Sequence, residues 1–104
     1  MNIDTLESYN NINNIDHGEK IVIFKIGTEW CEPCKTLQNT LEKFSDVVIY
    51  KMDMENEEFE SFYSENKIYN IPYCICKYND VVFRFKGLLT EEALRDKFTF
   101  LRLG

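Results

Sequence analysis

Apolar residues follow two different periods along this chain, and the changes of period mark out the predicted elements. Ile21–Ile26 is almost continuously apolar and β-branched, which predicts a strand buried on both faces of a parallel sheet. Val47–Met52 has the same character and predicts a second strand. Tyr73–Tyr78 and Val81–Phe85 flank the pair Asn79-Asp80, and this two-residue connection predicts a β-hairpin.

Three other segments repeat their apolar residues at helical spacing. They are a helix from Cys34, a helix over Glu55–Glu65 and a last helix capped by Thr90. Their apolar stripes are Leu37, Leu41 and Phe44; Phe59, Phe62 and Tyr63; and Leu94, Phe98 and Leu101. A short strand or helix entry over Ile3–Glu7 and a helix over Tyr9–Asp16 precede them. The order predicts an α/β fold, a mixed sheet of four or five strands flanked by helices on both faces.

The length, charge and apolar runs of the chain predict a single domain and argue against nucleic-acid binding and membrane spanning. The 104 residues (12.4 kDa) suffice for one core, and no Pro/Gly/Ser linker divides them, so residues 1–104 are expected to form a single domain. The net charge of −6, without a Lys/Arg cluster, repels phosphate backbones and argues against nucleic-acid binding. The longest purely apolar runs have four residues, too few to span a membrane.

The cellular compartment decides how the four cysteines are interpreted. The N-terminal segment Met1–Glu7 has neither a positive region nor an apolar region, so no secretory signal is expected and the cytoplasm is the predicted location. In a reducing cytosol, cysteine pairs are more often catalytic or metal-binding than structural. The ten Asn, ten Ile and nine Lys suggest an AT-rich genome, such as that of a virus, phage or parasite.

The segment Trp30-Cys31-Glu32-Pro33-Cys34-Lys35 carries the clearest chemical signal. It lies where a buried strand turns into an amphipathic helix, so Cys31 meets the unpaired N–H groups of a helix N-terminus, which stabilise a thiolate. The C-x-x-C spacing lets Cys34 reach Cys31 within one turn. Pro33 stiffens that turn in the first helical turn, where its missing N–H costs little. The arrangement indicates a dithiol/disulfide switch.

This motif resembles that of the thioredoxin family, with the Trp, both Cys, the Pro and the Lys matching. Ile71-Pro72 lies at about the family's spacing before the hairpin, and Gly87 follows the hairpin. The resemblance covers essentially the whole chain and implies a thioredoxin fold. Glutaredoxins, in contrast, place Pro first between the two cysteines.

The resemblance also implies roles. Cys31 would be the exposed nucleophile that attacks a substrate disulfide, and the more buried Cys34 would resolve the mixed disulfide. Pro72 would correspond to the family's cis-proline beside the active-site pair, although the sequence alone does not fix the isomer. The expected docking patch for protein substrates consists of Trp30, Ile71, Pro72, Gly87 and Leu88.

Lys25 departs from the family, which usually has a buried Asp six residues before the first Cys. Burying an ammonium group is costly unless it is paired or neutral. Either the strand shifts or Lys25 reaches a nearby carboxylate, or Lys25 lies near Cys34 and stabilises its thiolate or accepts its proton. Lys51, at the family's usual Lys position, would then add a like charge that depresses both pKa values.

Glu32 is the second departure, because the common family motif has Gly there. Its carboxylate is expected to disfavour the Cys31 thiolate. Cys74 and Cys76 face one side of a predicted strand, with Cβ atoms about 7 Å apart, too far for an unstrained disulfide. We interpret them as core residues. A four-cysteine zinc or iron–sulfur site is the alternative, although Trp30 and Pro33 would have no role in it.

Together these features predict a cytosolic thiol–disulfide oxidoreductase that reduces protein disulfides through Cys31 and Cys34 without a bound cofactor. A thioredoxin reductase or a similar donor would supply electrons, and the protein is expected to be a monomer. Two alternatives stay open: an oxidase or isomerase of the same fold, because the direction depends on fine electrostatics, and a non-enzymatic interaction module.

Overall fold

The computed structural model describes residues 2–5 and 19–103 of the chain. Its elements are β1 (Asn2–Thr5), β2 (Ile21–Gly27), α1 (Glu32–Leu41), β3 (Val47–Asp53), the 3-10 helix η2 (Glu57–Phe59), α2 (Glu60–Glu65), β4 (Tyr73–Tyr78), β5 (Val81–Lys86) and α3 (Glu91–Leu103). The predicted helix over Tyr9–Asp16 lies outside the described residues. None of the helices in the described ranges is long and apolar enough to cross a membrane.

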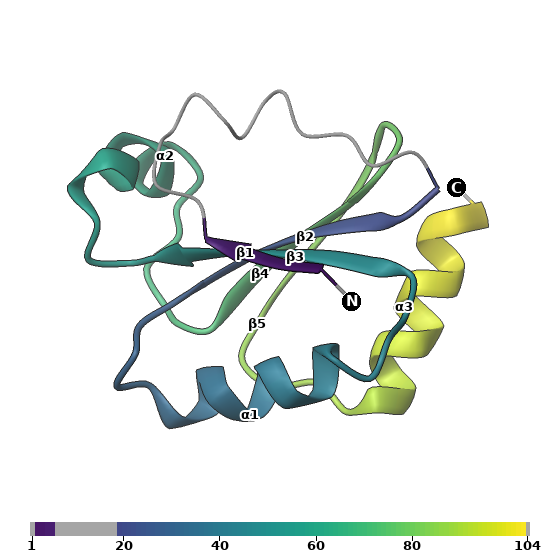
Figure 1. The fold of residues 1–104 in the computed structure, drawn as a ribbon. Helices are drawn as coiled ribbons and strands as arrows, with labels where there is room; N and C mark the ends of the chain where they lie inside the picture. The colour runs from purple at the N-terminus through teal and green to yellow at the C-terminus, as the bar shows by residue number, and fades with distance from the viewer. Residues whose placement is uncertain (1, 6–18, 104) are drawn as a thin grey trace.

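The five strands form one mixed sheet in the order β1-β3-β2-β4-β5 (Figure 1). β1 and β2 run parallel to β3, whereas β4 is antiparallel to both β2 and β5. The helices cover both faces, with α1 and α3 on one face and α2 on the other (Figure 1). The predicted α/β architecture is therefore confirmed, including a parallel half followed by a hairpin.

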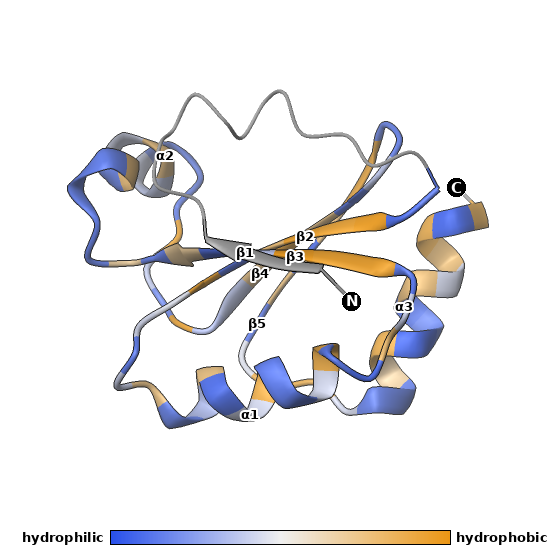
Figure 2. Cartoon of the chain, in the orientation of Figure 1, coloured by the Kyte–Doolittle hydropathy of each residue, from blue (hydrophilic) through white to orange (hydrophobic). Residues whose placement is uncertain are grey.

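The alternation of side chains along β2 explains why every one of its residues is buried. Ile21 and Ile23 pack in the core under α1 and α3, whereas Val22, Phe24 and Ile26 pack in the core under α2. Figure 2 shows β2 and β3 as strongly hydrophobic ribbons, whereas α1 and α3 alternate between hydrophobic and hydrophilic positions. The central strand is thus packed on both faces, and its carboxyl end leads into the loop before α1.

The structure corrects three predicted boundaries. α1 begins at Glu32 rather than Cys34 and ends at Leu41. Phe44 is still buried in the core, but i→i−3 hydrogen bonds such as Phe44 N–H to the Leu41 carbonyl (3.1 Å) have ended the α-helix before it. The acidic helix starts at Glu57, because the Asn56 side chain accepts the Glu58 N–H at 3.0 Å and caps it there.

The hairpin and the last helix agree with the sequence pattern. Tyr78 pairs with Val81 across the Asn79-Asp80 turn, and Asn79 adopts the left-handed conformation (φ 54°) that Asn tolerates. Thr90 Oγ1 accepts the N–H of Ala93 at 3.1 Å, so the predicted cap of α3 is confirmed.

Candidate functional site: a disulfide at the start of α1

The site lies where four strands of the sheet begin or end on the same side. Ile26, near the end of β2, pairs with Met52 near the end of β3 and with Tyr73 at the start of β4. Tyr73 in turn pairs with Lys86 at the end of β5. The loop to α1, the residues before β4 and the residues after β5 therefore emerge at the same edge.

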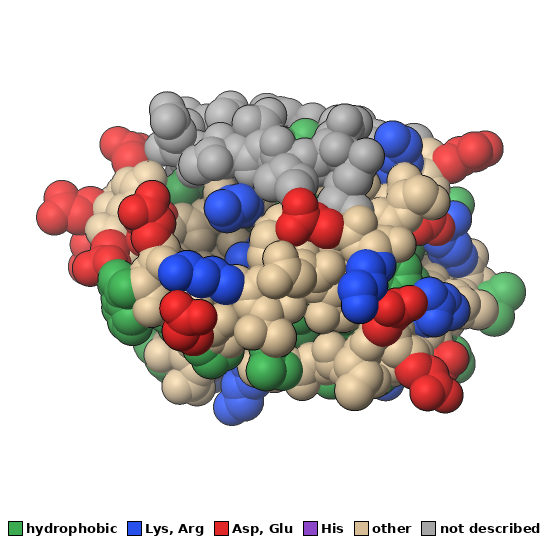
Figure 3. All heavy atoms as spheres, turned by 60° about the horizontal axis from the view of Figure 1, so that its bottom comes forward, with side chains coloured by type: hydrophobic (Ala, Val, Ile, Leu, Met, Phe, Trp, Pro, Cys, Tyr) green, Lys and Arg blue, Asp and Glu red, His purple; other side chains and the backbone are tan. Residues whose placement is uncertain are grey.

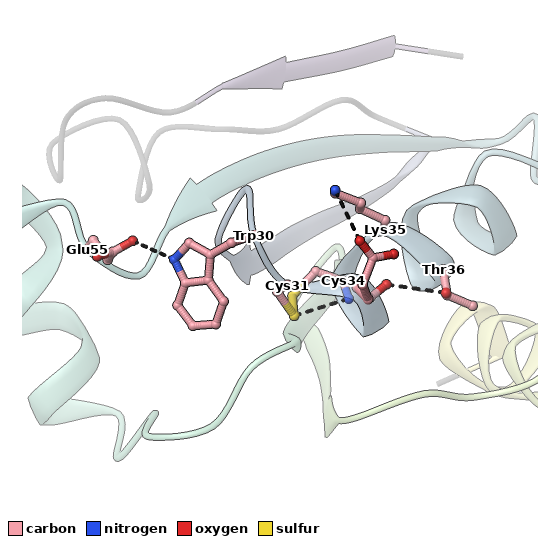
Figure 4. The surroundings of a disulfide bond; sticks show 7 residues. Trp30, Cys31, Cys34, Lys35, Thr36 and Glu55 are labelled. Atoms are coloured by element: carbon pink, nitrogen blue, oxygen red, sulfur yellow. Dashed lines mark hydrogen bonds and ion pairs between the residues drawn. A yellow bond between two sulfur atoms is a disulfide. The ribbon is translucent and has the colours of Figure 1, made fainter.

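Cys31 and Cys34 form a disulfide, with their Cα atoms 5.2 Å apart (Figure 4). Cys31 is the N-cap of α1, and its Sγ accepts the backbone N–H of Cys34 at 3.2 Å. The amino end of the helix dipole points at this sulfur, and both effects favour a thiolate once the disulfide is reduced. Pro33 lies in the first turn of α1, as predicted.

Cys31 is not exposed, although the sequence predicted an exposed nucleophile at this position. Cys31 is only 6% exposed and Cys34 is 2% exposed, so both count as buried. The order is as expected, because Cys31 is the more accessible of the two. In this oxidised state each sulfur is covered on one side by the other.

Gly27 has a contact with the site that the sequence interpretation missed. A Cβ added to Gly27 would lie 2.7 Å from Cys34 Sγ and 3.2 Å from Cys34 Cβ. Only glycine therefore lets the end of β2 approach the Cys34 sulfur this closely. The signal was present in the sequence, since Gly27 ends a buried apolar strand just before the Cys motif.

The predicted docking patch is part exposed and part buried. Trp30 is 68% exposed and Leu88 is 52% exposed, whereas Ile71 and Gly87 are half-buried and Pro72 is buried. The Ile71-Pro72 bond is cis, and the Pro72 carbonyl accepts the Gly87 N–H at 2.8 Å. This hydrogen bond ties the segments before β4 and after β5 together at the site's edge.

Trp30 is held in place by a residue that the sequence interpretation did not assign to the site. Its indole Nε1–H donates to Glu55 Oε1 at 3.0 Å, and Figure 4 shows the ring extending from the loop toward Glu55. Glu55 precedes the acidic start of η2, and Figure 3 shows Asp and Glu side chains gathered at the left end of the molecule. The exposed indole therefore has a negative neighbour.

Lys25 is buried, with 5% of its surface exposed, and β2 is not shifted to avoid this. It stands in register between Lys51 of β3 and Cys74 of β4. In the described part of the chain no carboxylate lies within ion-pair distance of Lys25. The interpretation of a shifted strand is therefore wrong, and an ion pair with a nearby carboxylate is not formed among these residues.

Burial is the main cause that lowers the pKa of Lys25, and the charge of Lys51 lowers it further, as predicted. Cys74 and Glu42 oppose this shift of the pKa. Lys25 also lines a cleft of about 620 Å³ together with Lys51, Gln38 and Cys34. The cleft therefore brings Lys25 and Cys34 to one space beside α1.

Glu32 lies in the first turn of α1, and its carboxylate is 3.3 Å from Lys35 Nζ. Both side chains are largely exposed, so this pair adds little to stability. The Lys35 charge offsets part of the effect of Glu32 on Cys31. The predicted opposition to the Cys31 thiolate should therefore be small.

We expect the variant Glu32→Gly to shift the alkylation-rate profile of reduced Cys31 to lower pH, by a few tenths of a pH unit, because a nearby exposed negative charge is removed. Iodoacetamide alkylation of the Cys34→Ser protein as a function of pH measures this shift. Glu92→Gly, in the first turn of α3, is the matched control and should leave the profile unchanged. A profile that stays fixed or moves to higher pH in Glu32→Gly contradicts the prediction.

Cys74 and Cys76 are free thiols and fully buried in the core under α1 and α3, as the strand alternation predicted. Burial raises the pKa of Cys74 to about 12, against the opposing charge of Lys25, and raises the pKa of Cys76 well above its ordinary value. In the described ranges no group of three or more His, Cys, Asp or Glu residues could hold a metal ion. The two thiols therefore pack as small apolar side chains.

The raised pKa values of Cys74 and Cys76 predict that the folded protein loses stability at alkaline pH. Above about pH 9 the thiols ionise in the unfolded chain but not in the folded one, so the unfolded state releases protons and gains stability, by about 1.4 kcal/mol per pH unit and group. Tyr63 acts in the same direction, because burial raises its pKa, whereas the lowered pKa of Lys25 acts in the opposite direction. Urea unfolding in the presence of a reductant should therefore show a steeper loss with pH for the wild type than for Cys74→Ala/Cys76→Ala. Equal slopes would show that these thiols are not the cause.

Comparison with known proteins agrees with this geometry. The thioredoxin family model matches residues 2–99. The chloroplastic F-type thioredoxin of Brassica napus is 39% identical over 82 residues, which are 74% of this chain and 44% of that relative. The chain thus spans about half the length of such curated relatives.

Solved structures show the same fold. A thioredoxin from Halobacterium salinarum superposes with a TM-score of 0.79 at 17% identity, covering 96% of this chain and 90% of the other. Thioredoxin f from spinach chloroplast has a TM-score of 0.73 at 21% identity, covering 97% and 94%. The predicted thioredoxin fold and the resemblance carried by the Trp30–Lys35 motif are both confirmed. With the family match over nearly its whole length, the chain belongs to the thioredoxin family.

Proposed function

We propose that this protein is a thiol–disulfide oxidoreductase that reduces disulfides of protein substrates through Cys31 and Cys34. One observation carries the proposal: Cys31 Sγ caps α1 and is joined to Cys34 as a disulfide. A helix N-terminus lowers the free energy of a thiolate, which is the attacking species in disulfide exchange. Membership of the thioredoxin family supports the same chemistry.

In the proposed cycle the Cys31 thiolate attacks one sulfur of a substrate disulfide and forms a mixed disulfide. The Cys34 sulfur then attacks Cys31 Sγ, so that the bond between Cys31 and the substrate breaks and the Cys31–Cys34 bond forms. Two electrons pass from the protein dithiol to the substrate, which leaves as two thiols. A thioredoxin reductase or a similar donor returns the pair to the dithiol, and we place this cycle in the reducing cytoplasm.

Substrates are proposed to dock on the patch of Trp30, Ile71, Pro72, Gly87 and Leu88. Its exposed members, Trp30 and Leu88, offer apolar area beside the sulfur, and the protein is proposed to act as a monomer. The half-buried Ile71 leads into β4, where an extended substrate segment could pair with its backbone.

The test is reduction of insulin disulfides with dithiothreitol as the electron donor. We expect the wild-type protein to accelerate the appearance of the precipitating insulin chain over dithiothreitol alone. Equilibration of the Cys31–Cys34 pair with glutathione then gives the direction of the reaction. A pair that stays oxidised across glutathione ratios typical of cytosol supports a reductant, and a pair that is readily reduced indicates an oxidase or isomerase. No acceleration of insulin reduction would overturn the proposal.

A further inference from the structure

Lys25 is buried and has no ion-pair or hydrogen-bond partner among the residues that the structure describes. Its neighbour in register on β3 is another lysine, Lys51. Burying an unpaired ammonium group costs several kcal/mol. A Met or Leu would fill the position at lower cost, so stability does not explain this lysine.

The cleft that Lys25 lines extends to Cys34, the proposed resolving cysteine. Cys34 lines it, and so do the exposed residues Lys35 and Asn39, which means that the cleft reaches the protein surface. Both polar atoms of the Gln38 side chain amide and Thr28 Oγ1 are buried, with no hydrogen-bond partner among the described residues. These groups offer hydrogen bonds to a lysine head group or to water beside Cys34.

The charged and titratable groups around Lys25 set its protonation. From the loop and helix side they are Glu29, Cys34, Lys35 and Glu42, and from the neighbouring strands they are Lys51, Asp53 and Cys74. Burial and Lys51 lower the pKa of Lys25, whereas Glu42 and Cys74 raise it, and the lowering prevails. A larger fraction of Lys25 is therefore in the neutral amine form, which can accept a proton, than of an exposed lysine.

We infer that Lys25 is the proton acceptor for Cys34 when the mixed disulfide is resolved. This inference rests on the proposed function and adds the group that activates the second thiol. The Lys25 amine takes the proton of the Cys34 thiol, and the resulting thiolate attacks Cys31 Sγ. The bond between Cys31 and the substrate breaks, and the departing substrate thiolate takes a proton from the Lys25 ammonium group, directly or through water. Lys25 returns to the neutral amine.

A single-turnover reaction separates the two steps. The reduced protein is mixed with one equivalent of the symmetric aromatic disulfide of thionitrobenzoate, whose released thiolate is coloured. The first release reports attack by Cys31, and the second, which is independent of concentration, reports attack by Cys34. We measure the second rate from about pH 6 to about pH 9 in wild type, Lys25→Met and Lys25→Arg, with Lys97→Met in α3 as a charge-matched control.

We expect both Lys25 variants to slow the second release about 10- to 100-fold near neutral pH, the range of a modest general-base contribution. Arg keeps the positive charge but cannot accept a proton, so it should not rescue the rate. The gap to wild type should close as pH rises, because hydroxide then ionises Cys34. Lys51→Met removes the like charge that lowers the pKa of Lys25. The pH profile of its second release should therefore lie at higher pH than that of the wild type. Lys97→Met should match the wild type.

Three results would overturn the inference. If the second release is unchanged in Lys25→Met across this pH range, Lys25 has no part in the step. If Lys25→Arg keeps the wild-type rate, a fixed charge suffices and proton transfer is not the role. If Lys25→Met slows both releases equally at every pH, the effect is structural. A wild-type protein that gives neither release would instead refute the proposed function.

Discussion

Replacing Cys31 with Ala is expected to abolish insulin-disulfide reduction, a loss of at least ~10³-fold to the background of dithiothreitol alone. No other thiol can take its place. Cys34 is more deeply buried than Cys31 and lies against Gly27, whereas Cys74 and Cys76 are buried in the core and their raised pKa values keep them protonated. Removal of a covalent nucleophile typically costs most of an enzyme's rate enhancement.

The matched control for this loss is Cys76→Ala, which removes a core thiol that has no part in the cycle. We expect it to keep the wild-type rate of insulin reduction while losing some stability to the smaller side chain. If Cys31→Ala retained a substantial fraction of activity, the assignment of the nucleophile would be wrong. Loss of activity in Cys76→Ala with an intact fold would contradict the purely structural role of that thiol.

Gly27→Ala is expected to shift the redox equilibrium of the Cys31–Cys34 pair toward the dithiol. The new methyl group would lie 2.7 Å from Cys34 Sγ, closer than carbon and sulfur can approach. In the disulfide the sulfur is fixed by its bond to Cys31 and cannot move away, whereas in the dithiol the Cys34 side chain can rotate. Overpacking of this kind costs about 1–3 kcal/mol. Because about 1.4 kcal/mol corresponds to about 30 mV for a two-electron couple, we expect the potential to rise by about 20–60 mV.

Equilibration of Gly27→Ala and wild type with glutathione buffers measures this shift. The control is Gly87→Ala, since Gly87 has a positive φ of 79° but no atom within 4 Å of an added Cβ. Its backbone strain should destabilise both redox states alike and leave the potential unchanged. A Gly27→Ala potential equal to or lower than that of the wild type would show that the contact does not distinguish the two states.

The fold could be predicted from the sequence because its strands are strongly patterned. The continuous apolar run of β2 indicates burial on both faces, and the Asn79-Asp80 turn indicates an antiparallel hairpin. Both signals are local and both agree with the tertiary structure. The boundaries of α1 were less predictable. Cys31 caps this helix through its sulfur, and no standard rule treats Cys as an N-cap residue.

The cysteine pair of the site was equally visible in the sequence, but its surroundings were not. The motif places two thiols at a helix start, which is a matter of spacing within a few residues. The approach of Gly27 to Cys34, the cleft shared by Lys25 and Gln38, and the bond from Trp30 to Glu55 all join residues whose distance depends on how β2, β3 and α1 pack. Such contacts follow from the three-dimensional register, which sequence periodicity alone does not give.

The claim that Cys31 attacks the substrate and Cys34 resolves the mixed disulfide is tested most directly in the Cys34→Ser protein. Without a resolving thiol, the reduced variant should form a stable mixed disulfide with a substrate such as insulin. Digestion under non-reducing conditions and mass spectrometry should then find one substrate chain linked to the peptide that contains Cys31. A substrate chain attached to Cys74 or Cys76, or no trapped chain from a folded protein that binds insulin, would contradict the account.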